Sequence, residues 1–406
     1  MVNLKLSTVK EILTSGYWLI ACLTGAFFCF FALNRGGAVV FIDIGFCFVS
    51  LNLITGQYKL KQIPSSHRIT LVICLYLILS GLLFASHHVK SNYVMYLLRM
   101  LFVVFTIHCL SLKKIDQRVY DYLPIVWCLC ICWQFAAVKF LSLPYGTYNN
   151  PHYLSNLLIS TLPLIVYSYW AAEGWHKWIY ILIALMAADM LVRTGSRTAI
   201  LGLTFSSLFM LVFFIKRRIR WIGLSATVLC FAFLYITNYG GAVNHLEELV
   251  LNLKTEERVY FWKSAFQMLE NNNATDWIFG NGIGGYRANY PAYSAPQFKR
   301  FFFPHLHPLG VLYDNGIIGL FMVFGGLATV FVLTIKALQN PPDKNISILL
   351  KCMLVIFMCW MIHSSLTFPF YSKYAQYPLG FILGTMLVLI DRSRYTRKKR
   401  PIFEMV

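Results

Sequence analysis

Most of the chain consists of long apolar runs that alternate with short polar connections. A helix that spans a lipid bilayer needs roughly 20 predominantly apolar residues, which is about the length of these runs. They predict twelve membrane-spanning helices, at about residues 17–33, 37–54, 69–85, 94–112, 120–140, 153–171, 178–192, 198–215, 221–237, 309–335, 346–366 and 375–391. The pattern therefore predicts an all-α polytopic membrane protein.

One long stretch, residues 238–307, interrupts this alternation. Within it, Leu246, Leu249 and Leu253 recur at the spacing of one helix face, so amphipathic helices are expected from about residue 244 to residue 270. The chain is accordingly divided into four parts: transmembrane helices 1–9 in residues 1–237, the large loop in 238–307, transmembrane helices 10–12 in 308–391, and a basic tail in 392–406.

Composition supports the membrane class and excludes the soluble ones. Hydrophobic residues make up 58% of the chain and charged residues only 13%, whereas a soluble domain averages about 25% charged residues. A soluble fold with so few charges could not cover its surface. All 11 cysteines fall in apolar runs, so the sequence predicts neither a disulfide framework nor a metal site. No cofactor is expected.

The net charge of +19 comes from 35 Lys and Arg residues against 16 Asp and Glu residues. Most of the positive charge lies in alternate short loops and in the C-terminal tail, which indicates membrane topology rather than nucleic-acid binding. Short loops on the cytoplasmic side of membrane proteins are enriched in Lys and Arg. This rule places both termini in the cytoplasm and residues 238–307 on the outer side of the membrane.

Arginines on the predicted outer side depart from this charge rule. Arg193 lies four residues after Asp189, a spacing that allows an ion pair on one helix face, and a structural pair is the preferred interpretation. Arg197 follows Gly195 and Ser196 at the predicted start of a helix. Backbone N–H groups and a guanidinium can bind an anion at such a position. A side chain that only reaches toward the membrane surface is the alternative.

Two histidines flank Leu306 just before the tenth predicted helix. Either His305 or His307 could accept a proton from a hydroxyl near neutral pH, and a buried structural histidine is the alternative for each. Two histidines at this spacing can also bind a metal, but no nearby Cys or cluster of carboxylates completes such a site. In the loop helix, Arg258 follows two glutamates, and on local sequence alone it is interpreted as a solvated surface residue.

Taken in order, these features resemble a known family. They are the Gly195-Ser196-Arg197-Thr198 run, a loop helix with Arg258 and Trp262, a glycine-rich run at 279–286, and His305 ahead of Gly316. This order is similar to that of the O-antigen ligase/polymerase superfamily of bacterial envelope glycosyltransferases. The resemblance covers roughly residues 150–390, and the His-Leu-His sequence favours the ligases. Many relatives have Asn directly after the catalytic His, where this chain has Leu306 or Pro308.

The resemblance implies an enzyme of the bacterial inner membrane with its active site on the periplasmic face. Such an enzyme transfers O-antigen from undecaprenyl pyrophosphate to a sugar hydroxyl of lipid A–core, without a metal and with inversion. The resemblance further implies that Arg197 and Arg258 bind the pyrophosphate, with Arg193 and Arg287 as additional candidates, and that His305 or His307 is the general base. An O-antigen polymerase that uses the same donor, and a transporter of twelve helices, are the alternatives.

Overall fold

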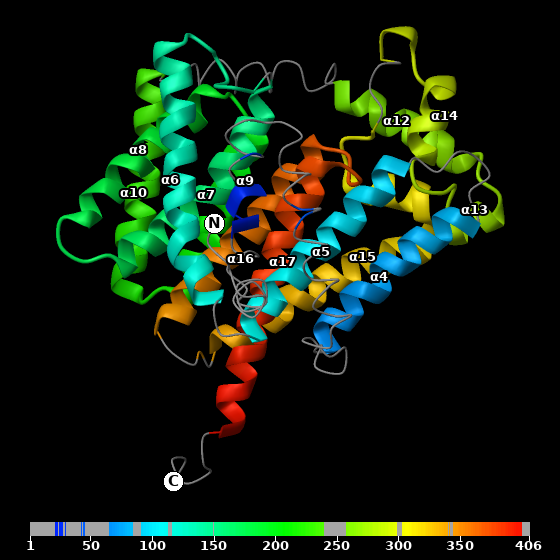
Figure 1. Ribbon diagram of the computed structural model, residues 1–406. Coiled ribbons are helices and arrows are strands. Elements are labelled where there is room, and N and C mark those ends of the chain that lie inside the picture. Colours follow the sequence, from blue (N-terminus) through cyan, green and yellow to red (C-terminus); the bar gives the residue numbers. More distant parts are fainter. Residues whose placement is uncertain are drawn as a thin grey trace, which may run out of the picture.

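The computed structural model describes residues 65–83, 91–112, 116–148, 150–238, 257–298, 303–339, 341 and 344–399, together with isolated positions between 21 and 44. Apart from the short 3-10 helix η3 (Pro296–Phe298), the secondary structure of these residues is α-helical (Figure 1). The helices are α4 (Ser65–Leu83), α5 (Ser91–Leu112), α6 (Asp116–Phe140), α7 (Pro151–Ala171), α8 (His176–Arg193), α9 (Arg197–Phe214), α10 (Arg217–Thr237), α12 (Glu257–Glu270), α13 (Ala274–Phe279), α14 (Gly285–Tyr293), α15 (His307–Gln339), α16 (Lys344–Thr367) and α17 (Lys373–Lys399). The predicted all-α class is confirmed.

Six of the described helices contain segments long and apolar enough to cross a membrane: α5, α7, α9, α15, α16 and α17. Each predicted apolar run from residue 69 onward falls on one of the described helices. The first two predicted runs, 17–33 and 37–54, lie largely outside the described residues, as do residues 244–256 of the predicted loop helix. The total of twelve membrane helices therefore stays a prediction.

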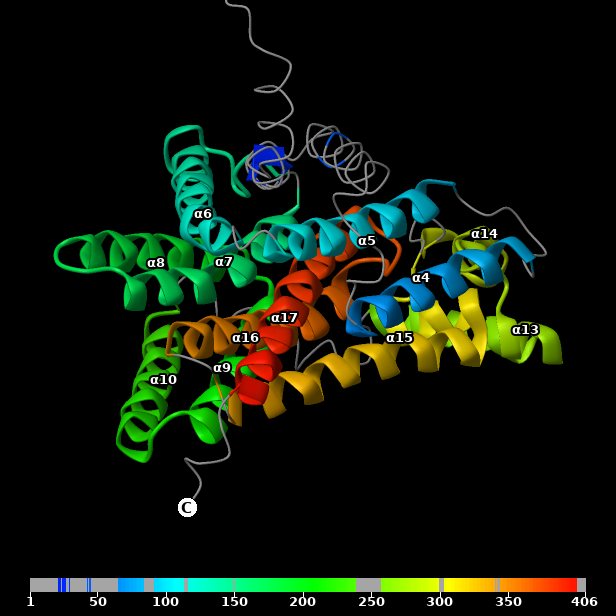
Figure 2. The same cartoon turned by 60° about the horizontal axis from the view of Figure 1, so that its bottom comes forward.

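Helix α16 lies at the centre of the bundle, in contact with α7, α9, α15 and α17. Its Trp360 is 2% exposed and donates a hydrogen bond to the carbonyl of Ala375 in α17 at 3.0 Å. Helix α17 lies close to α5 because Gly380 has no side chain: a Cβ there would be 2.8 Å from the Met100 carbonyl oxygen. Figure 2 shows α6, α8 and α10 on one side of this centre and α4 and α15 on the other.

Helix α15 is interrupted at Gly316, whose φ of 65° lies outside the helical region. Carbonyl groups in the turn before the interruption lose their partners within the helix. The glycine-rich run 280–286 supplies replacements, since the N–H of Asn281 donates to the Tyr313 carbonyl at 2.9 Å. This glycine-rich run is thus a strap across the interrupted helix.

Asp314 accepts further hydrogen bonds from the same strap, closer to its C-terminal end. Its carbonyl accepts from the N–H of Gly282 at 2.8 Å, and its carboxylate accepts from Gly284 N at 3.1 Å and Tyr286 N at 2.7 Å. Hydrogen bonds of this kind offset the cost of burying a carboxylate. The strap therefore fixes the loop helices α12 to α14 against the first half of α15, which begins at His307, two residues after His305.

Candidate functional site

The residues at the start of α15 are held by the C-terminal end of α16 and the residue that follows it. His305 Nδ1 lies 3.4 Å from the Leu366 carbonyl oxygen, and His307 Nε2 lies 2.8 Å from the Phe368 carbonyl oxygen. A carbonyl oxygen can only accept, so each of these ring nitrogens carries its hydrogen and donates it. His305 therefore keeps Nε2 as a lone-pair nitrogen, which is the form that a general base requires.

His305 occupies a strained and aromatic environment. Its φ of 49° lies in the left-handed region, which residues with a side chain rarely adopt and which is found disproportionately at functional sites. Its ring stacks on Phe303 and Phe261, with centroids 3.9 and 4.9 Å away. Burial, and then the positive charge of Arg258, lower the pKa of His305 to about 4. The imidazole is therefore neutral at physiological pH.

Arg258, in the loop helix α12, lies close enough for its charge to act on His305. It lies one turn before Phe261 on α12, and residues three apart share a helix face. Because Phe261 stacks on His305, this face of α12 is directed toward the residues that lead into α15. Arg258 is half-buried, unlike the solvated surface residue that its local sequence suggests. Its charge acts on His305, His152 and His363, so these side chains lie near one another.

Arg197 is the first residue of α9, and the residues beside it connect this helix end to α7. Ser196 Oγ and His152 Nδ1, in the first turn of α7, are 3.3 Å apart. His363 on α16 donates from Nε2 to the His152 carbonyl at 3.4 Å, and its Nδ1 accepts from the Thr198 hydroxyl at 2.9 Å. The first turns of α7 and α9 therefore meet at the end of α16, the same end of the bundle at which His305 lies.

This end of the bundle can bind an anion and accept a proton. Arg197 and Arg258 are positive charges, the N-terminus of α9 favours negative charge, and His305 is a neutral proton acceptor. Among the residues that the structure describes, no three His, Cys, Asp or Glu side chains gather as a metal-binding group. A phosphorylated substrate with a hydroxyl as its reaction partner fits these groups.

Residues 181–324 match the family model described as O-antigen ligase. The match confirms the resemblance to the O-antigen ligase/polymerase superfamily. It runs from α8 into α15 and includes Arg197, Arg258 and His305. Members of this family are glycosyltransferase-like enzymes of O-antigen or related pathways, and the family implies lipid-linked sugar substrates and a membrane environment. A search of curated proteins gives no match.

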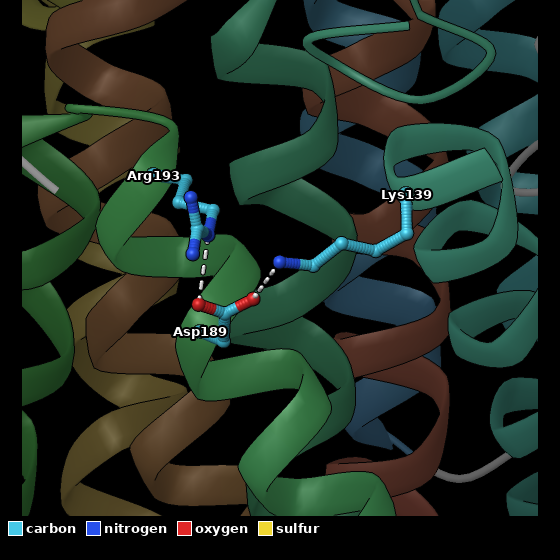
Figure 3. A network of polar contacts seen from close by, with 3 residues as sticks. All are labelled: Lys139, Asp189 and Arg193. Atoms are coloured by element: carbon cyan, nitrogen blue, oxygen red, sulfur yellow. Dashed lines mark hydrogen bonds and ion pairs between the residues drawn. The ribbon is translucent and has the colours of Figure 1, made fainter. Parts of the chain in front are cut away.

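Arg193, within the O-antigen ligase match, forms the predicted ion pair. Its Nε donates to Asp189 Oδ1 at 2.8 Å, and Lys139 Nζ from α6 lies 3.6 Å from Asp189 Oδ2 (Figure 3). The pairing with Asp189 is confirmed, and Lys139 is a second cation that the sequence did not indicate. The Asp189 side chain is 18% exposed, so both cations help to offset a carboxylate inside the helix bundle.

His307 and Arg287 lie around a neighbouring cavity rather than beside Arg258. His307 is 2% exposed, with the rings of Trp360 and Phe370 at 5.7 and 5.3 Å. Arg287 Nη1 donates to the Tyr93 hydroxyl at 3.3 Å. The cavity that His307 and Arg287 both line has a volume of about 30 Å³, which is enough to hold water. The structure thus separates the two candidate bases into different environments.

Two histidines of this candidate site, His152 and His363, were missed by sequence analysis. His363 lies inside an apolar run, and a polar side chain within a membrane helix is a recognised functional signal that could have identified it. His152 follows Asn150 and Pro151, where the Asn150 side chain caps α7 by accepting from His152 N at 2.8 Å. The local sequence predicts a helix start there but does not indicate where the histidine ring points.

Proposed function

We propose that the protein is a lipopolysaccharide O-antigen ligase, which transfers O-antigen polysaccharide from undecaprenyl pyrophosphate to a sugar hydroxyl of lipid A–core. The observation that carries the proposal is the grouping of Arg258 with a neutral, aromatic-flanked His305 beside the start of α9, where Arg197 lies. Positive groups fixed around a departing pyrophosphate stabilise the charge that develops on it.

In the proposed reaction the acceptor hydroxyl attacks the anomeric carbon of the donor while its proton passes to His305 Nε2. A carbon–oxygen bond forms on one face as the bond to the pyrophosphate oxygen breaks on the other, so the configuration inverts. Undecaprenyl pyrophosphate leaves with the bonding electrons, and Arg197 and Arg258 neutralise its charge. His305 then releases its proton to solvent. Phe261 and Phe303, on which the imidazole stacks, hold the ring of the base in place.

The site is proposed to face the periplasm. Basic residues lie at the opposite end of the bundle: Lys177, Lys216, Arg217, Lys336, Lys344 and Arg392. Such residues are enriched on the cytoplasmic side of membrane proteins. Alkaline phosphatase fused after Asn272 is expected to be active, and the same enzyme fused after Arg218 inactive. The reverse pattern would place the site in the cytoplasm and contradict the assignment of donor and acceptor.

The decisive experiment is transfer by the purified full-length protein in nanodiscs, supplied with lipid-linked O-antigen and lipid A–core. A ligase produces O-antigen attached to lipid A–core, which a gel and mass spectrometry detect. A polymerase consumes the same donor but produces longer lipid-linked chains and leaves lipid A–core unchanged. EDTA is expected to have no effect on the rate. If folded wild-type protein forms neither product, the proposal is wrong.

A further inference from the structure

His152 and Ser196 form a hydrogen-bonded pair beside the proposed donor site. Ser196 is 1% exposed, so its hydroxyl hydrogen requires an acceptor inside the protein. Within the described residues, that partner is His152 Nδ1 at 3.3 Å. Nδ1 therefore accepts from Ser196, and in the neutral imidazole the hydrogen is on Nε2.

His305 and His152 consequently offer opposite groups. His305 donates from Nδ1 to the Leu366 carbonyl and has its lone pair on Nε2, whereas His152 accepts at Nδ1 and has its N–H at Nε2. Within the part of the chain that the structure describes, the His152 ring bonds only through Nδ1. The site therefore contains a proton acceptor on one histidine and a hydrogen-bond donor on the other.

The His152 ring lies beside the first turn of α9, within range of the charge of Arg258. Ser196, its partner, directly precedes Arg197 in the chain. The His152 and His363 rings are 6.1 Å apart, and His363 Nε2 lies 3.4 Å from the His152 carbonyl oxygen. These contacts hold the His152 ring in a fixed relation to the first turn of α9. The charge of Arg258, which acts on His305, also acts on His152.

We infer that His152 is a third donor-binding residue, whose Nε2–H donates a hydrogen bond to a pyrophosphate oxygen of the polyprenyl-linked donor between Arg197 and Arg258. This inference rests on the proposed function, because it takes a polyprenyl pyrophosphate as the ligand. A hydrogen bond to a charged oxygen is about twice as strong as one between neutral groups. A neutral N–H also adds no charge that would repel the two guanidinium groups. Ser196 is then a positioning residue that fixes the tautomer of His152.

Two substitutions separate this role from a purely structural one. In His152→Gln the amide nitrogen reaches the place of Nε2, whereas in His152→Asn the shorter amide reaches only the place of Nδ1. His152→Gln is therefore expected to retain donor binding. His152→Asn is expected to retain the bond to Ser196 and lose donor binding. If the only function of His152 were to bond Ser196, this order would be reversed.

The direct measurement is the binding of undecaprenyl pyrophosphate to the purified full-length protein in nanodiscs. His152→Ala and His152→Asn are expected to weaken binding by about tenfold or more, as removal of a hydrogen bond to a charged group does. Both variants should raise the KM for the donor more than they lower kcat. His176→Ala is the matched control, since His176 opens α8 just beyond the other end of α7, about 30 Å away along that helix. It should bind like the wild type.

The wild-type result distinguishes failure of this inference from failure of the proposed function. If wild type binds undecaprenyl pyrophosphate and His152→Ala binds it equally well, the role given to His152 is wrong and the proposed function stands. The role given to His152 is also wrong, and the proposed function also stands, if His152→Asn preserves donor binding and His152→Gln does not. If wild type itself does not bind, the donor assignment fails and this inference fails with it. Thermal unfolding of each variant is measured first. If His152→Ala does not fold, the comparison of donor binding by His152→Gln and His152→Asn decides the question.

Discussion

The ring of Phe261 stacks on the imidazole of His305, with centroids 4.9 Å apart and planes inclined by 20°. Phe261 belongs to α12 in the large loop, and His305 lies just before α15, so this contact joins the loop to the membrane helices at the proposed base. Because Arg258 lies one turn from Phe261 on the same helix, the contact also positions that cation. The loop is therefore a component of the site rather than a cover over it.

His305→Ala is expected to lower the rate of transfer by about 10²–10⁴-fold, which is the usual contribution of a general base. The variant should still insert in the membrane and bind the donor, because Arg197 and Arg258 remain and the hydrogen bond that is lost, to the Leu366 carbonyl, is long at 3.4 Å. The measurement is transfer from lipid-linked donor to lipid A–core at matched protein levels. A variant that retains the full rate would show that His305 is not the base.

His307→Ala is expected to act on stability instead. His307 is 2% exposed and donates to the Phe368 carbonyl at 2.8 Å, so its removal leaves a buried carbonyl without a partner, at a cost of about 1–3 kcal/mol. The midpoint of thermal unfolding should fall, while the rate per folded molecule changes less than in His305→Ala. If folded His307→Ala is inactive and His305→Ala is active, the base is His307.

Asp189 pairs with both Arg193 and Lys139, so the loss of one of these two cations is expected to be tolerated. Arg193→Ala leaves Lys139 Nζ at 3.6 Å from the carboxylate, so the single variant should lose about 1 kcal/mol or less and remain active. Arg193→Ala combined with Lys139→Ala removes both cations and should cost about 3 kcal/mol. Thermal unfolding in nanodiscs measures both. A double variant as stable as the single one would mean that Lys139 does not stabilise Asp189.

Sequence predicts the parts of this molecule that depend on local order. The apolar runs locate the helices because burial in a bilayer requires a long run of neighbouring apolar residues, and the Asp189–Arg193 pair follows from a spacing of four residues. The His-Leu-His segment was also identifiable. In contrast, the Thr198–His363 bond joins residues 165 positions apart, and the Ser196–His152 pair joins residues 44 positions apart. No local pattern encodes such contacts, because they arise only when the helices assemble.

The glycine-rich run illustrates the same limit. Its sequence indicates a turn, but its function depends on the interruption of α15 at Gly316. Gly316→Ala is expected to prevent correct folding, because a Cβ there would overlap the Ile278 carbonyl oxygen and the residue has a φ of 65°. Backbone strain of this type costs about 1–3 kcal/mol, and the overlap adds to it. Gly325→Ala, on the same helix with open space around it, is the control. Equal yields and unfolding midpoints for the two variants would contradict this account.

Arg258→Gln is expected to move the acid limb of the rate profile to higher pH. In the wild type, burial and the Arg258 charge lower the pKa of His305 to about 4, so the neutral base is lost only in strong acid. Without the guanidinium, one of the causes that oppose protonation is gone, and the pKa of His305 rises toward its ordinary value of about 6.5. The pH dependence of kcat/KM reports the ionisation of the free enzyme and is the quantity to measure.

Arg258→Lys retains the positive charge and should keep the acid limb near its wild-type position, although its rate should fall because the planar fork for the pyrophosphate is lost. If Arg258→Gln and the wild type have the same acid limb, Arg258 does not control the ionisation of the base, and its contribution would be confined to binding the donor.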